Sequence, residues 1–230
     1  LPAGIPRKIW WRGTPAPSCV NHYPDGDLNI NMLPAMEGEE FLALGYPKSY
    51  DECRRRLFCH WHFLQTHFPE FQNYRIKKIF PMLGVRETYR TFCEKMLTEN
   101  DILRTLRRQD DPDIVAIADH ALDRHCEGAS CPEEEHPYGI PYRCLIPKGW
   151  RNLVVACRGA GFSSIAASSV RLSRTMMQLG QAAGTAAAIA KDRRCGLPDV
   201  PPDLLRKCLR EEHVQLEFPL TEDLLGHISE

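Results

Sequence analysis

The chain has 230 residues, enough for one or two domains, and its 43% apolar content can supply a buried core. A formal net charge of −1 argues against binding to nucleic acid or another polyanion as the main activity. The longest Ala-rich stretch, residues 169–191, contains Gln178 and Gln181 and ends in charged residues, so no membrane span is expected.

The first residue is Leu1 rather than Met, which suggests a processed, trimmed or excerpted chain, and the opening LPAGIPRKIWWRG lacks the apolar run of a signal peptide. The ten cysteines are scattered through the whole sequence rather than clustered in a small scaffold. We expect most of them to be reduced and buried, which slightly favours a reducing compartment such as the cytoplasm. The presence of one or two disulfides is left as an open alternative.

In the first third of the chain, residues 1–26 are rich in Pro and Gly and are expected to form loops. The alternating segment Asp27–Met32 predicts a strand. Tyr50–His67 predicts a helix with acidic residues in its first turn, and Pro69 ends it. The segments Asn73–Phe80 and Val85–Cys93 each predict a strand.

The predicted helix carries His60, His62 and His67, which raises the question of a metal site. His60 and His67 are seven residues apart and can face one way, but His62 points elsewhere and no carboxylate has ligand spacing. A core helix that stacks its histidines and aromatic side chains is therefore the favoured interpretation.

Arg86 and Arg90 share parity in the predicted second strand, so both project from one face. Two guanidinium groups on one face can grip a carboxylate or orient an acidic substrate. A solvated or salt-bridged strand face explains the same spacing equally well.

Further along the chain, Thr98 followed by Asp101 resembles a capping box and predicts a helix to Arg108. Ile114–Leu122 is short and apolar, and it can form a helix or a strand. Asp203–Glu211 predicts an amphipathic helix near the end of the chain.

Five potential zinc ligands occur between residues 120 and 136 in the spacing H-x4-H-C-x4-C-x4-H: His120, His125, Cys126, Cys131 and His136. Zinc accepts such ligands four at a time, but this spacing matches no known zinc finger. An ordinary surface loop is favoured over a structural zinc site, and no metal ligand is assigned.

The stretch from residue 143 to residue 191 organises the chain. It predicts a buried strand at Leu153–Cys157, a loop of small residues at Arg158–Ser168 and a helix at Ser169–Lys191. Ser168 and Ser169 can cap that helix, and Arg171 and Arg174 lie beside its first amides, so an anion would be favoured there. A tightly packed core helix is the alternative.

The hexapeptide GAGFSS at residues 159–164 imitates a dinucleotide-binding fingerprint between a strand and a helix. Its last position is Ser164 rather than Gly or Ala, and no strand ending in an acidic residue follows about 20 residues on. We therefore do not assign it to the Rossmann phosphate-binding loop.

Four sequence runs in a fixed order resemble the FAD-dependent oxidoreductases related to the fumarate reductase flavoprotein group. In chain order they are DLNINM at 27–32, FPEFQNYRIKKIFPMLGVRETYR at 68–90, IPYRCLIPKGWRNLVVACR at 140–158 and SSVRLSRTMMQLGQAAGTAAAIA at 168–190. LGVRE and GQAAGTAAA are the specific parts, and the resemblance covers most of residues 27–212.

This resemblance implies an α+β or α/β chain in which a substrate-type domain with a mixed sheet precedes the C-terminal strand-loop-helix part of a Rossmann-like FAD-binding domain. The implied boundaries are 1–137 for the substrate domain, 138–195 for the returning part of the FAD domain and 196–230 for a helical tail. The implied activity is hydride transfer between a small organic substrate and flavin N5, with FAD as cofactor.

The resemblance also assigns site residues. Catalytic roles fall on Arg86 and Arg171, and the amides near residues 169–171 would stabilise negative charge on the pyrimidine side of reduced flavin. The residues assigned to FAD binding are Arg158, Gly159, Ser169, Val170, Arg171 and Gln181.

Two departures from the family pattern limit the functional interpretation. Ser164 stands where the family often has His, which removes one proton donor or flavin contact. No GxGxxG unit for the adenosine and pyrophosphate is found in the chain, so either that half lies outside this sequence or the protein has lost it. The missing half or an electron-transfer protein is the expected partner. A non-catalytic scaffold that binds a partner or ligand is the alternative function.

Overall fold

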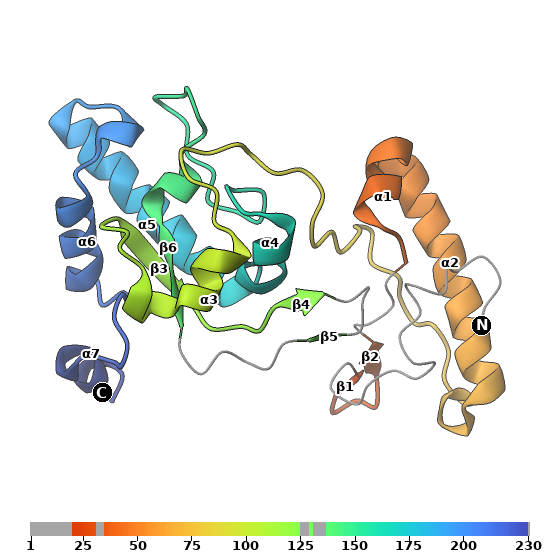
Figure 1. Ribbon diagram of the computed structural model, residues 1–230. Coiled ribbons are helices and arrows are strands. Elements are labelled where there is room, and N and C mark those ends of the chain that lie inside the picture. The colour runs from red at the N-terminus through yellow and green to blue at the C-terminus, as the bar shows by residue number, and fades with distance from the viewer. Residues whose placement is uncertain (1–19, 31–34, 125–128, 131–136, 230) are drawn as a thin grey trace. The chain divides into compact units, whose positions relative to one another are not determined.

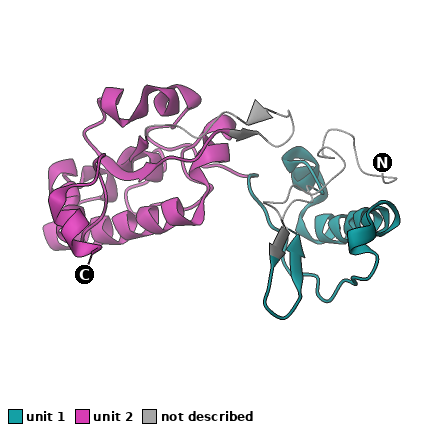
Figure 2. Cartoon of the chain, turned by 90° about the horizontal axis from the view of Figure 1, so that it is seen from below, with its two compact units in different colours: residues 1–88, 125–129 teal, residues 89–124, 130–230 magenta. Residues whose placement is uncertain are grey.

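The computed structural model describes residues 20–30, 35–124, 129–130 and 137–229. The chain divides into two compact units, which Figure 2 colours separately. Unit 1 comprises residues 1–88 and 125–129, and unit 2 comprises residues 89–124 and 130–230. The boundary predicted near residue 137 from the family resemblance stays a prediction about the family's domains.

The described part of unit 1 contains a short strand pair and two helices. Its helices and strands are β1 (Val20–His22), β2 (Leu28–Ile30), α1 (Gly38–Leu44), α2 (Tyr46–His67) and a 3-10 turn at Pro69–Phe71. β1 and β2 are antiparallel, with Asn21 opposite Asn29. The predicted strand at 27–32 is confirmed over β2, and the predicted helix is confirmed over α2, although it begins four residues earlier than expected.

The two strands predicted at 73–80 and 85–93 are wrong, because neither segment forms a strand in the structure. Helix α2 supplies the hydrogen bonds that a partner strand would otherwise provide. Gln65 Nε2 donates to Tyr74 O at 2.9 Å, and Tyr50 Oη donates to Phe80 O at 3.1 Å. Carbonyl groups that are paired by side chains need no strand partner.

Arg56 on α2 joins the two helices of unit 1 through a side chain that is only 8% exposed. Its Nη1 donates to Ala35 O at 2.7 Å, its Nη2 donates to Glu40 at 2.5 Å, and its Nε donates to Glu52 at 2.7 Å. A buried guanidinium needs such partners on every donor edge. This contact holds α1 against α2.

The buried ring of His60 on α2 makes the stability of unit 1 pH-dependent. Burial lowers the pKa of His60 from its ordinary 6.5 to about 4, so the folded state keeps the ring neutral. Since the unfolded chain binds the proton more tightly, stability is full above about pH 6.5 and falls as the pH drops toward 4.

We expect the free energy of unfolding to fall by roughly 3 kcal/mol across that window, since each pKa unit corresponds to about 1.4 kcal/mol. Urea unfolding between pH 7 and pH 4 measures it. In the variant His60→Leu, the part of the pH dependence that comes from this ring should disappear. An unchanged pH profile in His60→Leu would contradict the assignment.

Unit 2 is built around the antiparallel pair β3 (Ile114–Ala118) and β6 (Tyr138–Pro141), whose residues are all buried. Helix α3 (Glu99–Arg108) packs on β6, and helices α5 (Ser173–Arg193) and α6 (Pro202–Glu211) pack on β3 (Figure 1). The open alternative for residues 114–122, a helix or a strand, is thereby settled as a strand over residues 114–118, and residues 119–122 form neither.

The other elements of unit 2 complete this core or continue beyond it. They are β4 (Asp123–Arg124), 3-10 turns at Tyr142–Leu145 and Leu197–Asp199, α4 (Ser164–Val170) and α7 (Glu222–His227). A further short strand, β5 (Ala129–Ser130), lies where the chain passes from unit 1 back into unit 2. The mixture of helices with small sheets confirms the α+β class. No helix among the described residues is both long and apolar enough to cross a bilayer.

The start of α3 has the predicted capping arrangement. The Asp101 carboxylate accepts hydrogen bonds from Thr98 N at 2.8 Å and from Thr98 Oγ1 at 2.9 Å. The predicted helix at 203–211 is likewise confirmed as α6. Both predictions rest on local signals, which explains why the sequence alone sufficed for them.

Candidate functional site

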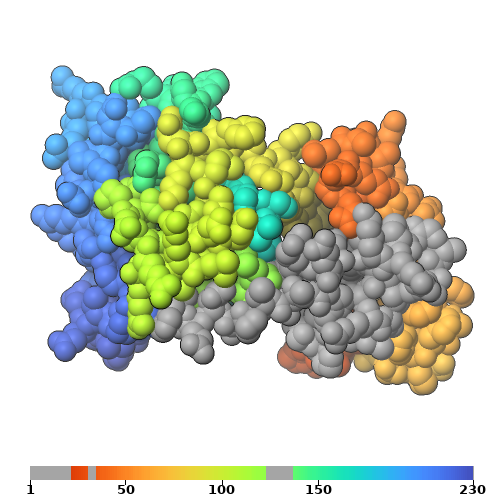
Figure 3. Space-filling model, viewed as in Figure 1, coloured from red at the N-terminus to blue at the C-terminus, as the bar shows by residue number. Residues whose placement is uncertain are grey.

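The loop at residues 157–163 is held by backbone hydrogen bonds on two sides. Thr91 N donates to Gly159 O, and Leu97 N donates to Gly161 O, each at 2.8 Å. On the other side Gly161 N donates to Cys144 O at 2.8 Å. Figure 3 shows yellow atoms, the colour of residues near 91, next to teal atoms, the colour of the loop and of α4, on this face of unit 2. The loop is therefore fixed before any ligand binds.

The small residues of this loop serve contacts within the chain itself. A Cβ atom at Gly161 would lie 2.5 Å from Lys95 O and 2.9 Å from Cys144 O, so two backbone segments pack directly on this glycine. A Cβ atom at Gly159 would meet Tyr89 O at 3.4 Å, an ordinary contact distance. The two glycines of the GAG run thus have different roles.

The segment that leads into the loop is not the buried strand predicted at Leu153–Cys157. It has no strand partner, and Leu153 and Cys157 are exposed, while Val155 N donates to Leu145 O at 2.8 Å. The segment is therefore an extended stretch beside the core, attached there by the hydrogen bond from Val155. The loop predicted for 158–168 is shorter than expected, because α4 begins at Ser164.

The prediction that Ser168 and Ser169 cap a helix is wrong. Ser163 caps α4, and its Oγ accepts a hydrogen bond from Ala166 N at 3.1 Å. Ser168 Oγ instead donates to Ile165 O within α4. The sequence offered a signal for the correct cap, since Ser163 and Ser164 stand directly before the apolar run at 165–167.

Ser169 and Val170 are buried in the last turn of α4. Ser169 Oγ contacts Tyr138 Oη at 2.6 Å and donates to His120 O. Val170 is fully buried in the apolar core. These side chains serve the interior of unit 2, and their predicted role in FAD binding stays a prediction.

The single helix predicted at 169–191 is interrupted between α4 and α5. Leu172 has an extended conformation, with φ −68° and ψ 148°, and α5 begins at Ser173. The side chain of Leu172 is apolar, so it cannot accept a hydrogen bond from the first amides of α5. Among the described residues no acceptor is found for the amides of Ser173, Arg174 and Thr175. The free amides of a 21-residue helix thus lie about four residues later than expected.

Positive side chains surround this helix start. Arg158 Nε donates to Arg171 O at 3.0 Å, which links the loop to the break between the helices. Arg174, on the first turn of α5, pairs with Asp119. The amides, the helix dipole and Arg158 and Arg171 together make a positive region that favours an anion or an electron-rich carbonyl group.

Exposed aromatic side chains lie on the segment that pairs with the loop, a feature that the sequence analysis did not single out. Tyr89 is 76% exposed and Phe92 is 81% exposed, and Phe92 O accepts a hydrogen bond from Lys148 N. Apolar rings of this size that are exposed together mark ligand or partner surfaces. They adjoin Gly159 through the Thr91 hydrogen bond.

Gln181 lies away from the helix start, on an exposed part of α5 that also contains Gly180 and Gly184. It is eight residues beyond Ser173, which corresponds to about 12 Å along a helix. Gln178 is the glutamine with a structural contact, because its Oε1 accepts a hydrogen bond from Ile117 N of β3. The assignment of Gln181 to FAD stays a prediction.

Arg86 belongs to unit 1, where it is half-buried, and Arg171 belongs to unit 2. Arg86 and Arg90 do not lie on a common strand face, since the strand predicted for them is absent. Their spacing therefore gives no support for a shared carboxylate-binding face, and only the family resemblance supports a catalytic role for Arg86.

The thiols behind the loop are unsuited to nucleophilic chemistry. Burial raises the pKa of Cys93 to about 11 and that of Cys144 further still. All seven described cysteines are free thiols: Cys53, Cys59, Cys93, Cys144, Cys157, Cys195 and Cys208.

Among the predicted metal candidates, four of the five residues of the 120–136 cluster lie outside the described residues. His120 is described, and its Nδ1 lies 2.6 Å from Ala121 O. On α2, His60 is buried and His67 stacks on Phe63 at 4.2 Å. Within the described part of the chain no group of three His, Cys, Asp or Glu side chains could hold a metal ion.

Comparison with known families agrees with the resemblance in the sequence. A family model described as FAD dependent oxidoreductase matches residues 8–209. The chain therefore belongs to the FAD-dependent oxidoreductase family, whose cofactor is FAD. Searches of curated proteins and of solved structures find no match.

Proposed function

We propose that this chain forms the flavin-ring side of an FAD-dependent oxidoreductase related to the fumarate reductase flavoprotein group, and that it acts on a small organic substrate. The start of α5 carries this proposal, because three free helix amides lie there beside Arg158 and Arg171. When bound, FAD supplies the redox chemistry by taking up or giving up a hydride.

The residues present fit the pyrimidine side of an isoalloxazine ring. That side is rich in carbonyl oxygens, and the amides of Ser173, Arg174 and Thr175 can donate to them. Arg158 and Arg171 add positive charge at the same place, which favours electron density on the ring. Gly159, with no side chain, leaves the loop surface low enough for a flat group to approach.

In this proposal Arg86 orients an acidic group of the substrate, as the LGVRE resemblance suggests. An arginine suits that role because its planar guanidinium binds a carboxylate through two hydrogen bonds. Arg171 contributes positive charge at the flavin rather than a proton, because an arginine keeps its proton at any working pH.

The adenosine and diphosphate of FAD require a βαβ unit with GxGxxG, which we propose is supplied by a segment outside these 230 residues. The sequence contains no such motif, and each sheet among the described residues has two strands. The near-match at 159–164 is already committed to backbone contacts with residues 95–97 and 144. An electron-transfer partner is a further proposed requirement.

The test is a pair of substitutions at the first residue of α5. Ser173→Asp places a carboxylate where it can accept hydrogen bonds from the free amides, and Ser173→Asn is its neutral isostere. We expect Ser173→Asp to raise the dissociation constant for FAD at least about tenfold relative to Ser173→Asn, equivalent to the loss of one charge-assisted hydrogen bond. Flavin fluorescence and absorbance titrations measure it.

Stability provides the internal control, because a carboxylate at a helix start stabilises the fold by about 0.5 kcal/mol. Weaker flavin binding in a variant that is at least as stable cannot come from misfolding. Riboflavin, which lacks the diphosphate, should lose affinity by the same factor if the α5 amides hold the ring.

Two results would contradict binding of the isoalloxazine ring at the start of α5. One is equal affinity of the two variants for FAD, and the other is a loss of affinity for FAD without a loss for riboflavin. A wild-type protein that carries the dinucleotide-binding segment and still binds neither flavin would favour the alternative function, a non-catalytic scaffold for a partner or ligand. The observation behind that alternative is Ser164, which begins α4 where the family often has His.

A further inference from the structure

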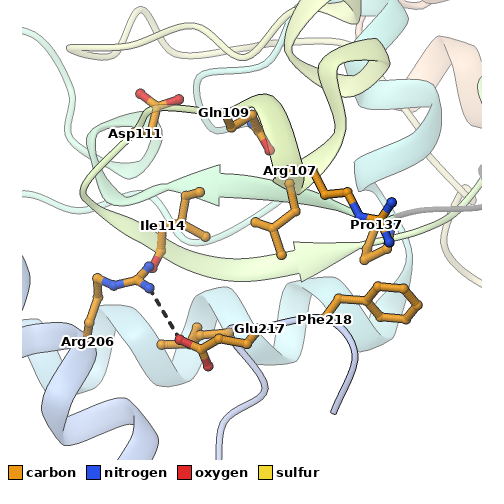
Figure 4. Close-up of a pocket in the computed structure, with 10 residues that line it drawn as sticks. Arg107, Gln109, Asp111, Ile114, Pro137, Arg206, Glu217 and Phe218 are labelled. Carbon is orange, nitrogen blue, oxygen red and sulfur yellow. Dashed lines mark hydrogen bonds and ion pairs between the residues drawn. The ribbon is translucent and has the colours of Figure 1, made fainter. Parts of the chain in front are cut away.

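A pocket of about 320 Å³ lies in unit 2, on the side of β3 that faces α6 and the C-terminal segment (Figure 4). It shares no residue with the loop at 157–163 or with the start of α5. The lining residues come from the end of α3, the start of β3, α6 and the segment that follows α6: Leu106, Arg107, Gln109, Asp111, Ile114, Pro137, Arg206, Leu216, Glu217 and Phe218. Its volume lies at the lower end of the range for small-molecule sites.

Apolar side chains form much of the pocket wall. Ile114 and Leu216 are almost completely buried, and Leu106, Pro137 and Phe218 contribute further apolar surface. Such a wall can bind the hydrocarbon or aromatic body of a ligand.

The two carboxylates in the pocket wall are already neutralised by basic residues. Asp111 pairs with Lys95 at 2.6 Å and with Arg143 at 2.9 Å. Glu217 pairs with Arg210 at 2.6 Å, and Arg206 lies farther from it, at 3.5 Å. Asp111 is therefore neutralised by residues outside the pocket, and Glu217 is shared between Arg210 and the more distant Arg206.

Arg206 is a largely buried cation with weak compensation. Its Nη1 donates to Ile114 O at 2.5 Å, and Glu217 is its only ion-pair partner among the described residues. Burial, followed by repulsion from Arg210, lowers the pKa of Arg206. A guanidinium in this condition is stabilised by any further negative charge nearby.

Arg107 is an exposed guanidinium at the pocket, and it forms no ion pair with the residues that the structure describes. Figure 4 shows Arg107 and Arg206 on opposite sides of the pocket, with Ile114 between them. Gln109 does not compete for a ligand, because its side-chain amide is bonded to both Gly139 N and Gly139 O. Arg107 is thus the group with its full set of donors available.

We propose that this pocket is a second small-molecule site, which binds an organic anion with one carboxylate on an apolar or aromatic body. The carboxylate pairs with Arg107 through two hydrogen bonds, and the body lies against Ile114, Leu216 and Phe218. Arg206 adds attraction from the far side of the pocket. The site is independent of the flavin site, so either one can fail without the other.

Phenylacetate is the probe, and phenylacetamide is its uncharged isostere. By calorimetry or ligand-observed NMR in low salt, we expect phenylacetate to bind with a dissociation constant on the order of 1 mM. Phenylacetamide should bind at least about tenfold more weakly, because it lacks the charge that Arg107 recognises. Acetate, which has the charge without the body, should also bind at least about tenfold more weakly.

The matched variants are Arg107→Gln and Arg108→Gln, both in the last turn of α3, of which only the first residue lines the pocket. Arg107→Gln should weaken phenylacetate binding about tenfold, and Arg108→Gln should change it less than about twofold. Equal melting temperatures of the two variants would show that both are folded.

Three results would overturn the proposal. They are no saturable binding of phenylacetate up to about 10 mM, ten times the expected constant, equal binding of phenylacetamide, and equal losses in the two variants. The first would exclude the site, the second would exclude recognition of charge, and the third would exclude Arg107 as the anchor.

Discussion

Gly161→Ala is expected to destabilise unit 2 by about 3–5 kcal/mol. The new Cβ atom would lie 2.5 Å from Lys95 O, 2.7 Å from Cys93 Cβ and 2.9 Å from Cys144 O. Two of these atoms belong to the backbone, so no flexible side chain can move aside. Overpacking of this kind costs about 1–3 kcal/mol, and displacing the loop also weakens the hydrogen bonds of Gly161 with Leu97 and Cys144, at about 1 kcal/mol each.

A loss of this size is a large part of the 5–15 kcal/mol that typically stabilises a domain, so the variant should unfold at much lower urea concentration. Gly159→Ala is the control, since its Cβ would meet Tyr89 O at 3.4 Å, and it should change stability by less than about 1 kcal/mol. A Gly161→Ala protein as stable as the Gly159→Ala protein would show that the loop can shift freely.

Arg56→Ala should have the second large effect, a destabilisation of unit 1 by about 3 kcal/mol. The substitution leaves Glu40 and Glu52 without their shared cation and leaves Ala35 O without its donor. Because both carboxylates are partly exposed, water recovers some of this loss, which keeps the expected effect at the lower end for a buried ion pair.

The neighbouring Arg55→Ala is the matched control. Arg55 also pairs with Glu52, at 2.8 Å, but its side chain is 51% exposed. We expect a loss of less than about 1 kcal/mol, as for other surface ion pairs. Urea unfolding followed by circular dichroism compares the two variants, and similar midpoints would contradict a special role for the buried arginine.

The Arg56 effect should also depend on acidity. Hydrogen bonds from Arg55, and then from Arg56, lower the pKa of Glu52 from 4.5 to about 2. A carboxyl group with a lowered pKa stabilises the fold above its unfolded pKa and loses that contribution as the pH falls toward the folded one. The difference between wild type and Arg56→Ala should therefore shrink below about pH 4.5.

Local signals explain which elements could be predicted from the sequence. The capping box of Thr98 and Asp101 marked the start of α3, Pro69 marked the end of α2, and amphipathic spacing marked α6. These signals act within one or two turns, so they need no knowledge of the rest of the fold.

The strand predictions at 73–80, 85–93 and 153–157 failed for a shared reason. An apolar or alternating run becomes a strand only when another strand pairs with it, and the sequence of the run does not reveal whether one is available. Here side chains of α2 bond the carbonyl groups of the first segment, and a single bond to Leu145 holds the last.

The candidate site shows the same division. The resemblance in the runs at 140–158 and 168–190 sufficed to predict the family and its FAD cofactor, and the family match agrees with both. The resemblance placed the free helix amides near Ser169, whereas they lie at the start of α5, at Ser173. No Gly or Pro in the sequence marks the break at Leu172. That break follows from the burial of α4 by contacts of Ser169 with Tyr138 and His120.

The sequence by itself thus determined the family, the cofactor and those helices whose ends carry capping or amphipathic signals. Only the tertiary structure decided that Gly161 serves the packing of the loop, that α5 begins at Ser173, and that Arg107 and Arg206 line one pocket. The physical reason is range, since caps and periodicity act over a few residues. Backbone approach, burial and the pairing of charges depend on segments beyond that range, such as Ile114 and Arg206, which are 92 residues apart.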